Sequence, residues 1–513
     1  MGTFNSAGSG NANADATWTE AGQPAAGDHV IIGSHTVTLT AHEAWGSVQI
    51  TGGGTLAGGG YTLTLNDGGN STIFDHDGTI TGHLDVTLTG GTSRNLDIQS
   101  VGSIRTLIIN NGSSTFTLSA SGTHTVTTLT ITAGELDTGS DRALTVTGTT
   151  TVDGTLTLNA STVVTASVGG TGTVACGTAN ITCSDNFNAR TITMDAATLD
   201  IADRLGEANG TGGTVTVSGT STATISCLRM PGTRLTPGHS TLTLDGGTAA
   251  EALDIEGAGS CWNVIVNSSG TKTMGSAITI ANDLTITAGT LDTGSNYALT
   301  VDGDVSIADG GILTGNASAI ELGSLTIEDG GEYNATSGTT TLAGQTGTNN
   351  LCFKCTAGTF THNNGTLNIT GNTWGTSSYA HIWVGTNQDF GNVTINAGAD
   401  SKYYQFRAGS TTFYFNNFYA KYGEIRDYNN NNTFHIRGNL DIGTRGAGGT
   451  AGYFGESEWR DNDNTCKTIV DGLVTVYTDG QFHVAYGTDG TDGCKVGGIR
   501  NVGGTVYAVE QDD

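Results

Sequence analysis

The chain has 513 residues, of which 80 are glycine and 3 are proline, and charged residues make up only 13% of it. A hydrophobic share of 36% is too high for a disordered polar tract, so the chain is expected to fold. The formal net charge of −28 repels phosphate backbones and anionic lipids, which excludes nucleic acid and membrane surfaces as partners for most of the length.

Residues 1–17 are small and polar, and they lack the basic start and apolar core of a signal peptide. We expect them to form a flexible or docking arm. No stretch of the sequence approaches the ~20 apolar residues of a membrane span, so we expect a soluble chain.

Residues 18–400 consist of short segments in which Val, Ile or Leu alternates with Thr, separated by Gly, Asp, Asn or Ser. A period of two places the aliphatic side chains on one face of a strand and Thr on the other. The segment 129–148 returns at 284–303 with four differences, which indicates an internal repeat. Strands this short become stable when successive coils of chain stack at roughly 4.8 Å and share one apolar interior.

The sequence therefore predicts an all-β protein, a parallel β-helix or β-solenoid, with about 20–25 residues in each coil. A tandem array of β-sandwiches is the competing interpretation, because short strands with frequent turns also describe such arrays. Thr-x-Thr strands that stack in register also form the flat hydroxyl arrays of ice-binding solenoids, although irregular spacing argues against one continuous array here.

Residues 401–513 hold 18 of the 34 aromatic residues of the chain. We expect this part to continue the solenoid or to form a cap, an assembly contact or a binding surface. Aromatic faces stack on sugars and carboxylates bind hydroxyl groups, so a glycan-binding patch is one interpretation, and packing is the other. The candidate ligand-binding residues are Tyr403, Tyr404, Tyr419, Tyr422, Glu424, Arg426, Asp427 and Trp459.

Asp489 and Asp492 lie in a Gly-rich turn and are weak candidates for a Ca²⁺ site, with a solvated loop as the alternative. We expect no other cofactor. Eight cysteines permit disulfides, and the close pairs are Cys176 with Cys183 and Cys352 with Cys355. Buried free thiols that act as small hydrophobic side chains are the alternative.

The opening segment 18–32, followed by the strand sequence 36–39, resembles the entry segment of right-handed parallel β-helix surface proteins. Segments 262–307 and 360–369 are similar to repeats of bacterial adhesins and of phage tail-fibre and virion-surface proteins. This resemblance implies a structural protein of a virion surface or appendage and, by analogy, a homo-oligomer that contacts other virion or surface proteins. The motifs specify no ligand, so attachment to a host-cell glycan is an expectation from the aromatic and acidic residues above. A secreted, extracellular bacterial adhesin is the alternative.

Parallel β-helices also include polysaccharide-degrading tailspikes, which is the third interpretation. Their sites need two or three carboxylates in a groove. Most carboxylates here sit in turn sequences such as those at 66–69 and 308–311, where an Asp before Gly has an ordinary role in the turn. We therefore expect a protein that is not an enzyme, and we assign no catalytic residue.

Overall fold

The computed structural model describes the chain except for residues 68, 100–103, 120, 207–213, 232–234, 257–259, 345–350, 371–378, 397–402, 428–431, 444–451, 455–466, 479, 485–493 and 509–513. It divides into two compact units, Met1–Leu242 and Thr243–Asp513. Apart from one 3₁₀ turn, Asp15–Thr17, the named elements of the described residues are β-strands.

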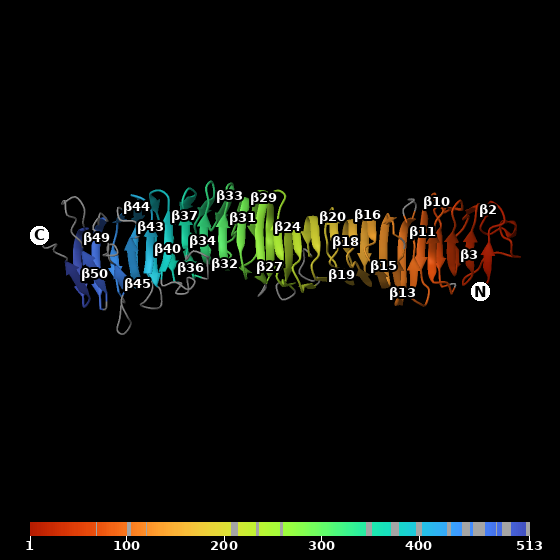
Figure 1. Cartoon of the computed structure of the whole chain (residues 1–513), viewed down its shortest axis with the longest axis horizontal. Helices are drawn as coiled ribbons and strands as arrows, with labels where there is room; N and C mark the ends of the chain where they lie inside the picture. Colours follow the sequence, from red (N-terminus) through yellow and green to blue (C-terminus); the bar gives the residue numbers. More distant parts are fainter. Residues whose placement is uncertain are drawn as a thin grey trace. The chain divides into compact units, whose positions relative to one another are not determined.

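Unit 1 is a β-solenoid whose coils contribute one strand to each of several parallel ladders, and these strands lie side by side in Figure 1. One ladder contains β15 (Thr128–Asp137), β17 (Thr155–Thr157), β19 (Thr173–Gly177), β21 (Thr191–Met194) and β23 (Thr214–Val217). A second contains β14 (Thr123–Val126), β16 (Ala143–Val152), β18 (Thr162–Gly169), β20 (Asn180–Cys183), β22 (Thr198–Leu205) and β24 (Thr222–Pro231).

Unit 2 is built in the same way from parallel strands. One ladder contains β29 (Asn263–Met274), β31 (Leu284–Asp292), β33 (Gly311–Thr314), β35 (Glu332–Asn334) and β38 (Thr359–Thr361). A second contains β32 (Leu299–Ile307), β34 (Ile320–Ile327), β37 (Leu351–Cys355), β40 (Tyr379–Val384), β43 (Tyr403–Arg407) and β45 (Asn417–Asp427). A third contains β41 (Gln388–Asp389), β44 (Thr412–Phe415), β46 (Thr433–Ile436) and β49 (Lys467–Tyr477).

The length of a coil follows from the register of neighbouring strands. Thr155 pairs with Thr173 and Thr173 with Thr191, so these two coils are equal in length and shorter than the sequence predicts. In unit 2, Leu325 pairs with Phe353, which makes that coil longer than the sequence predicts. The β-solenoid prediction is confirmed, and the parallel pairing between successive coils excludes antiparallel sandwiches for the described ladders.

The first residues belong to the solenoid of unit 1. Strand β1 (Thr3–Asn5) pairs in parallel with β3 (His29–Ile32). Trp18 is 4% exposed and makes edge-to-face contacts with Phe4 and Trp45, at centroid distances of 6.3 and 6.2 Å. Burial of these rings places Thr3–Asn5, part of the segment 1–17 that the sequence predicts as a flexible or docking arm, against the first coils.

The repeated segments fold into the same turn, one in each unit. Asp137 accepts hydrogen bonds from the backbone N–H two residues later (2.7 Å) and from the side-chain amide of Asn159 in the next coil (2.6 Å). Asp292 accepts the equivalent bonds, both at 2.7 Å, the second from Asn316. The Asp of this turn therefore joins two coils, which explains its place in both copies.

Part of the interior of unit 2 is aromatic, with aliphatic core before and after it. The buried rings of this stretch include Phe353, Phe360, Phe390, Phe406, Phe413, Phe415, Phe418 and Phe434. Phe406 lies edge-on to Phe413 at 5.0 Å, and Phe415 lies edge-on to Phe418 at 4.9 Å. The change in composition near residue 400 therefore reflects a change of core packing within unit 2, and the division between compact units lies at Leu242.

Candidate functional site

Two of the predicted ligand-binding residues are buried. Tyr404 is 0% exposed, and its strand neighbour Phe406 belongs to the aromatic core. Asp427 is 3% exposed and accepts a hydrogen bond of 2.5 Å from the side-chain amide of the buried Asn432. Neither residue presents a surface for a ligand, and both instead support the fold.

The other predicted site residues are only partly placed. Tyr419 lies half-buried on β45, between Thr394 and Asp441 of the neighbouring coils. Tyr403, Tyr422, Glu424 and Arg426 lie in described strands, but their side chains lie outside the described part. Trp459 and the two calcium candidates, Asp489 and Asp492, lie outside the described residues.

Cys176, Cys183, Cys352 and Cys355 are free thiols in the structure, all of them buried. Burial raises the pKa of the Cys176 thiol to about 12 and that of Cys355 to about 11. Because the thiolate is the reactive form, these side chains behave as small hydrophobic core residues at neutral pH. The proposed pairs of these four cysteines are therefore not disulfides in this structure.

The Thr-x-Thr strands of unit 1 form a partial array. Thr155, Thr173, Thr191 and Thr214 are aligned across four successive coils. In the preceding coil the aligned residue is Glu135, whose carboxylate accepts a hydrogen bond of 2.6 Å from Thr157. In this direction the array ends at a charged residue, whereas the sequence predicts that irregular spacing interrupts it.

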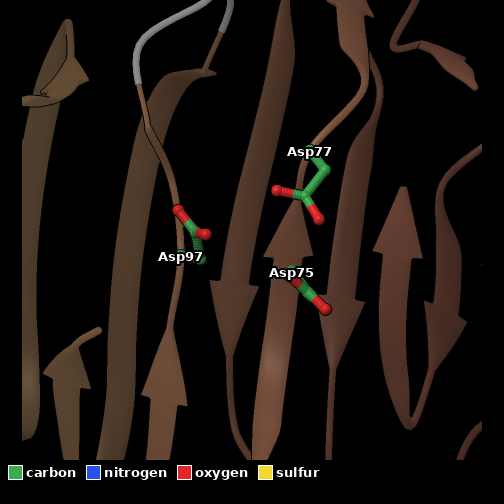
Figure 2. A group of neighbouring side chains, drawn as sticks. All are labelled: Asp75, Asp77 and Asp97. Atoms are coloured by element: carbon green, nitrogen blue, oxygen red, sulfur yellow. The ribbon is translucent and has the colours of Figure 1, made fainter. Parts of the chain in front are cut away.

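A cluster of three carboxylates lies on unit 1 and was missed by sequence reasoning. Asp75 belongs to β9 (Thr72–His76), Asp77 follows this strand, and Asp97 follows β12 (Arg94–Leu96) in the next coil. Figure 2 shows the three side chains near one another, and one oxygen atom of each lies within 4.8 Å of the others. Burial, together with the charges of Asp77 and Asp97, raises the pKa of Asp75.

These oxygen atoms are hard ligands of the type that Ca²⁺ takes in proteins, although calcium needs six to eight of them. The amide of Gln49 donates a hydrogen bond of 2.8 Å to Asp75, and the backbone N–H of Gln99 donates one of 3.1 Å to Asp97. Two of the three carboxylates are thus stabilised by protein groups. The arrangement can share a proton or attract a cation, and we assign no metal to it.

A polar network lies on the outer face of the third ladder of unit 2. Asp389 accepts a hydrogen bond of 2.6 Å from the guanidinium of Arg437, and His362 lies 3.7 Å from the same carboxylate. The Arg437 guanidinium lies 4.9 Å from the centre of the Tyr414 ring. Nε2 of His435 lies 2.9 Å from a carboxylate oxygen of Asp471. These pairs join different coils, and the arginine already occupies one face of the tyrosine.

A second outer-face group lies where β37, β40 and β43 meet. Lys354, Trp383 and Arg407 are register partners in three successive coils. Two residues earlier on β40 and β43, His381 and Gln405 are also partners, and they are only 4% and 7% exposed. We call these five residues the Trp383 block.

The Trp383 block combines an exposed ring with cations and a buried acceptor. Trp383 is 40% exposed, the one exposed aromatic side chain among the described residues, and the Arg407 guanidinium lies 5.8 Å from its ring centre. Oε1 of Gln405 is buried and has no hydrogen-bond partner within the described part of the chain. Burial, and then the charge of Arg407, lowers the pKa of His381 to about 4, so this ring is neutral at pH 7.

Comparison of the chain with family models, curated proteins and solved structures finds no match. The fold alone therefore defines the class, and both units are parallel β-solenoids. Among the described residues, no helix has the length and apolar character needed to cross a membrane.

Proposed function

We propose that the chain is a structural β-solenoid of a virion surface or appendage that also attaches to a host-cell glycan. The observation that carries the structural part is the filled interior of each unit. Core side chains such as Trp45, Tyr333 and Phe413 are fully buried. A cavity inside unit 1, lined by Leu156, Val174 and their neighbours, has a volume of only about 10 Å³, room for about one water.

Because the interior is filled, ligands and partner proteins can bind only to the outer faces of a solenoid. The resemblance of segments 262–307 and 360–369 to repeats of bacterial adhesins and virion-surface proteins supports an extracellular, virion-bound location. The proposed role is non-enzymatic, with other virion proteins and a second copy of the chain as partners. Excess negative charge agrees with this role because it opposes non-specific association with nucleic acid and anionic membranes.

The test is to detect the chain in purified virus particles with an antibody against the recombinant protein. We expect a fixed number of copies in each particle and gold label on the particle surface in electron micrographs. Detection in the secreted fraction of virus-free bacteria, with none in particles, would instead support the adhesin alternative and overturn the virion assignment.

A further inference from the structure

We propose that the Trp383 block is a binding site for an acidic polysaccharide, which locates the attachment function within unit 2. This inference rests on the attachment part of the proposed function. It does not depend on whether the chain resides in a virion or is secreted.

The first argument is charge. Only 19 Lys and Arg residues stand against 47 Asp and Glu in the whole chain, yet Lys354 and Arg407 lie in one row on either side of Trp383. Glu328 forms an ion pair of 3.0 Å with Lys354, and its side chain is 44% exposed. Glu328 therefore offsets part of the charge of Lys354. Because salt screens charges beyond about 8 Å under physiological conditions, the distant carboxylates of the chain oppose an acidic ligand less than this neighbouring one does.

The second argument is the exposed indole. Large aromatic side chains are normally buried, and Trp383 departs from this rule while the phenylalanines of the same unit's core follow it. An indole face packs against the C–H face of a sugar ring and leaves the hydroxyl groups free for hydrogen bonds. The adjacent guanidinium suits a carboxylate, because its planar donors match the two carboxylate oxygens.

The third argument is the unsatisfied acceptor. A buried carbonyl oxygen without a donor destabilises a folded protein, and Oε1 of Gln405 is in this state among the described residues. Gln405 lies two residues from Arg407 on the same strand, so both side chains face outward. A sugar hydroxyl is a suitable donor. The Trp383 block thus offers an acceptor for a hydroxyl group, a cation for a carboxylate and an apolar ring for a sugar face. A uronic acid unit carries all three complementary groups.

The experiment measures binding of the full chain to polygalacturonate, a polymer of uronic acid, with neutral dextran as the reference polymer. We expect binding to polygalacturonate that weakens as salt is added, and no binding to dextran. Trp383→Ala and Arg407→Gln should each weaken the binding at least tenfold. Arg500→Gln is the matched control, because Arg500 is an exposed arginine on β51 (Cys494–Val502), and it should change binding less than twofold.

Three results would overturn the inference: no binding to polygalacturonate, unchanged binding by the Trp383 and Arg407 variants, or an equal loss in the Arg500 control. The last would indicate diffuse attraction to any cation. If Trp383→Ala fails to fold, Trp383→Phe keeps a ring and should retain more binding than Arg407→Gln. A negative result in this binding experiment does not change the outcome expected for detection in virus particles. The two experiments can therefore contradict the two proposals independently.

Discussion

At the scale of single residues, glycine determines whether neighbouring coils can approach closely. Gly134 lies on β15, within the first repeated segment, with φ of +87°, and a Cβ atom there would stand 2.0 Å from the backbone oxygen of Asn111 in the preceding coil. Both the left-handed backbone and the close approach require glycine. Gly289, at the same position of the second repeat, has φ of +75°.

Gly134→Ala is therefore expected to lower the free energy of unfolding by about 2 kcal/mol or more, because alanine adds backbone strain and a steric clash. Gly112→Ala is the matched control, since a Cβ atom at Gly112 meets no atom within 4 Å among the described residues. We expect the control to lie within about 0.5 kcal/mol of the wild type in urea denaturation. Equal stability of the two variants would contradict the close stacking of these coils.

The carboxylate cluster gives a prediction about pH. The folded-state pKa of Asp75 is raised by burial and by its two acidic neighbours, so the folded protein binds its proton more tightly than the unfolded chain. Stability from this group is therefore present at low pH and is lost as pH rises through the folded pKa. Asp75→Asn removes the charge while keeping the shape of the side chain.

We expect Asp75→Asn to stabilise unit 1 at pH 7 by a few tenths of a kcal/mol, a small gain because the site is partly exposed. The gain should disappear below the ordinary Asp value of 3.8, where the wild-type group is also neutral. Urea denaturation of the variant and the wild type at pH 3.5 and 7 in low salt measures this difference in the free energy of unfolding. Asp153→Asn is the control, because hydrogen bonds from Thr171 lower the pKa of Asp153 and no gain at pH 7 should follow. A gain at pH 3.5 would refute this account of the cluster.

At the scale of strands, alternation in β44 separates the core from the surface. Phe413 and Phe415 are 0% exposed, whereas Tyr414 between them faces outward. Phe413 packs against Phe406 at 5.0 Å and Phe434 at 5.4 Å. The strand thus buries two rings in the interior of unit 2 while presenting a third to the outer face.

Phe413→Ala is expected to destabilise unit 2 by about 3 to 5 kcal/mol, because it removes a fully buried ring from a packed core. Tyr414→Ala, next to it in the chain, should cost about 1 kcal/mol or less, mainly through the lost contact with Arg437. Thermal unfolding followed by circular dichroism distinguishes the two. Similar losses for both would mean that the strand does not alternate as described.

Strand alternation also marks what could be predicted from the sequence. The period of two identified the strands and their inward Leu, Ile and Val, because it depends only on neighbouring residues. The same rule, applied to segment 412–415, places its two phenylalanines in the interior, so aromatic composition alone overstates the aromatic surface of this region. Tyr404, a predicted ligand-binding residue, is likewise interior, since it alternates with Gln405 on β43.

At the scale of the whole molecule, the register between coils is the feature that could not be predicted from the sequence. Asp97 meets Asp75 from the next coil, and Arg407 likewise meets Trp383 from the coil that follows it. The coil that joins Thr155 to Thr173 is shorter than the coils that bring these residues together, and the coil that joins Leu325 to Phe353 is longer than them. Turn insertions set these lengths, and no local pattern reveals them, so side chains that lie together on an outer face could not be paired from the sequence alone.

The central claim is that successive coils stack in parallel and share one interior within each unit. The most direct measurement is a cryo-electron microscopy map of the purified chain at a resolution that separates strands. We expect layers of density about 4.8 Å apart within each unit, with one coil per layer where Thr155, Thr173 and Thr191 align. Compact modules of antiparallel strands, each closed around its own core, would contradict the claim.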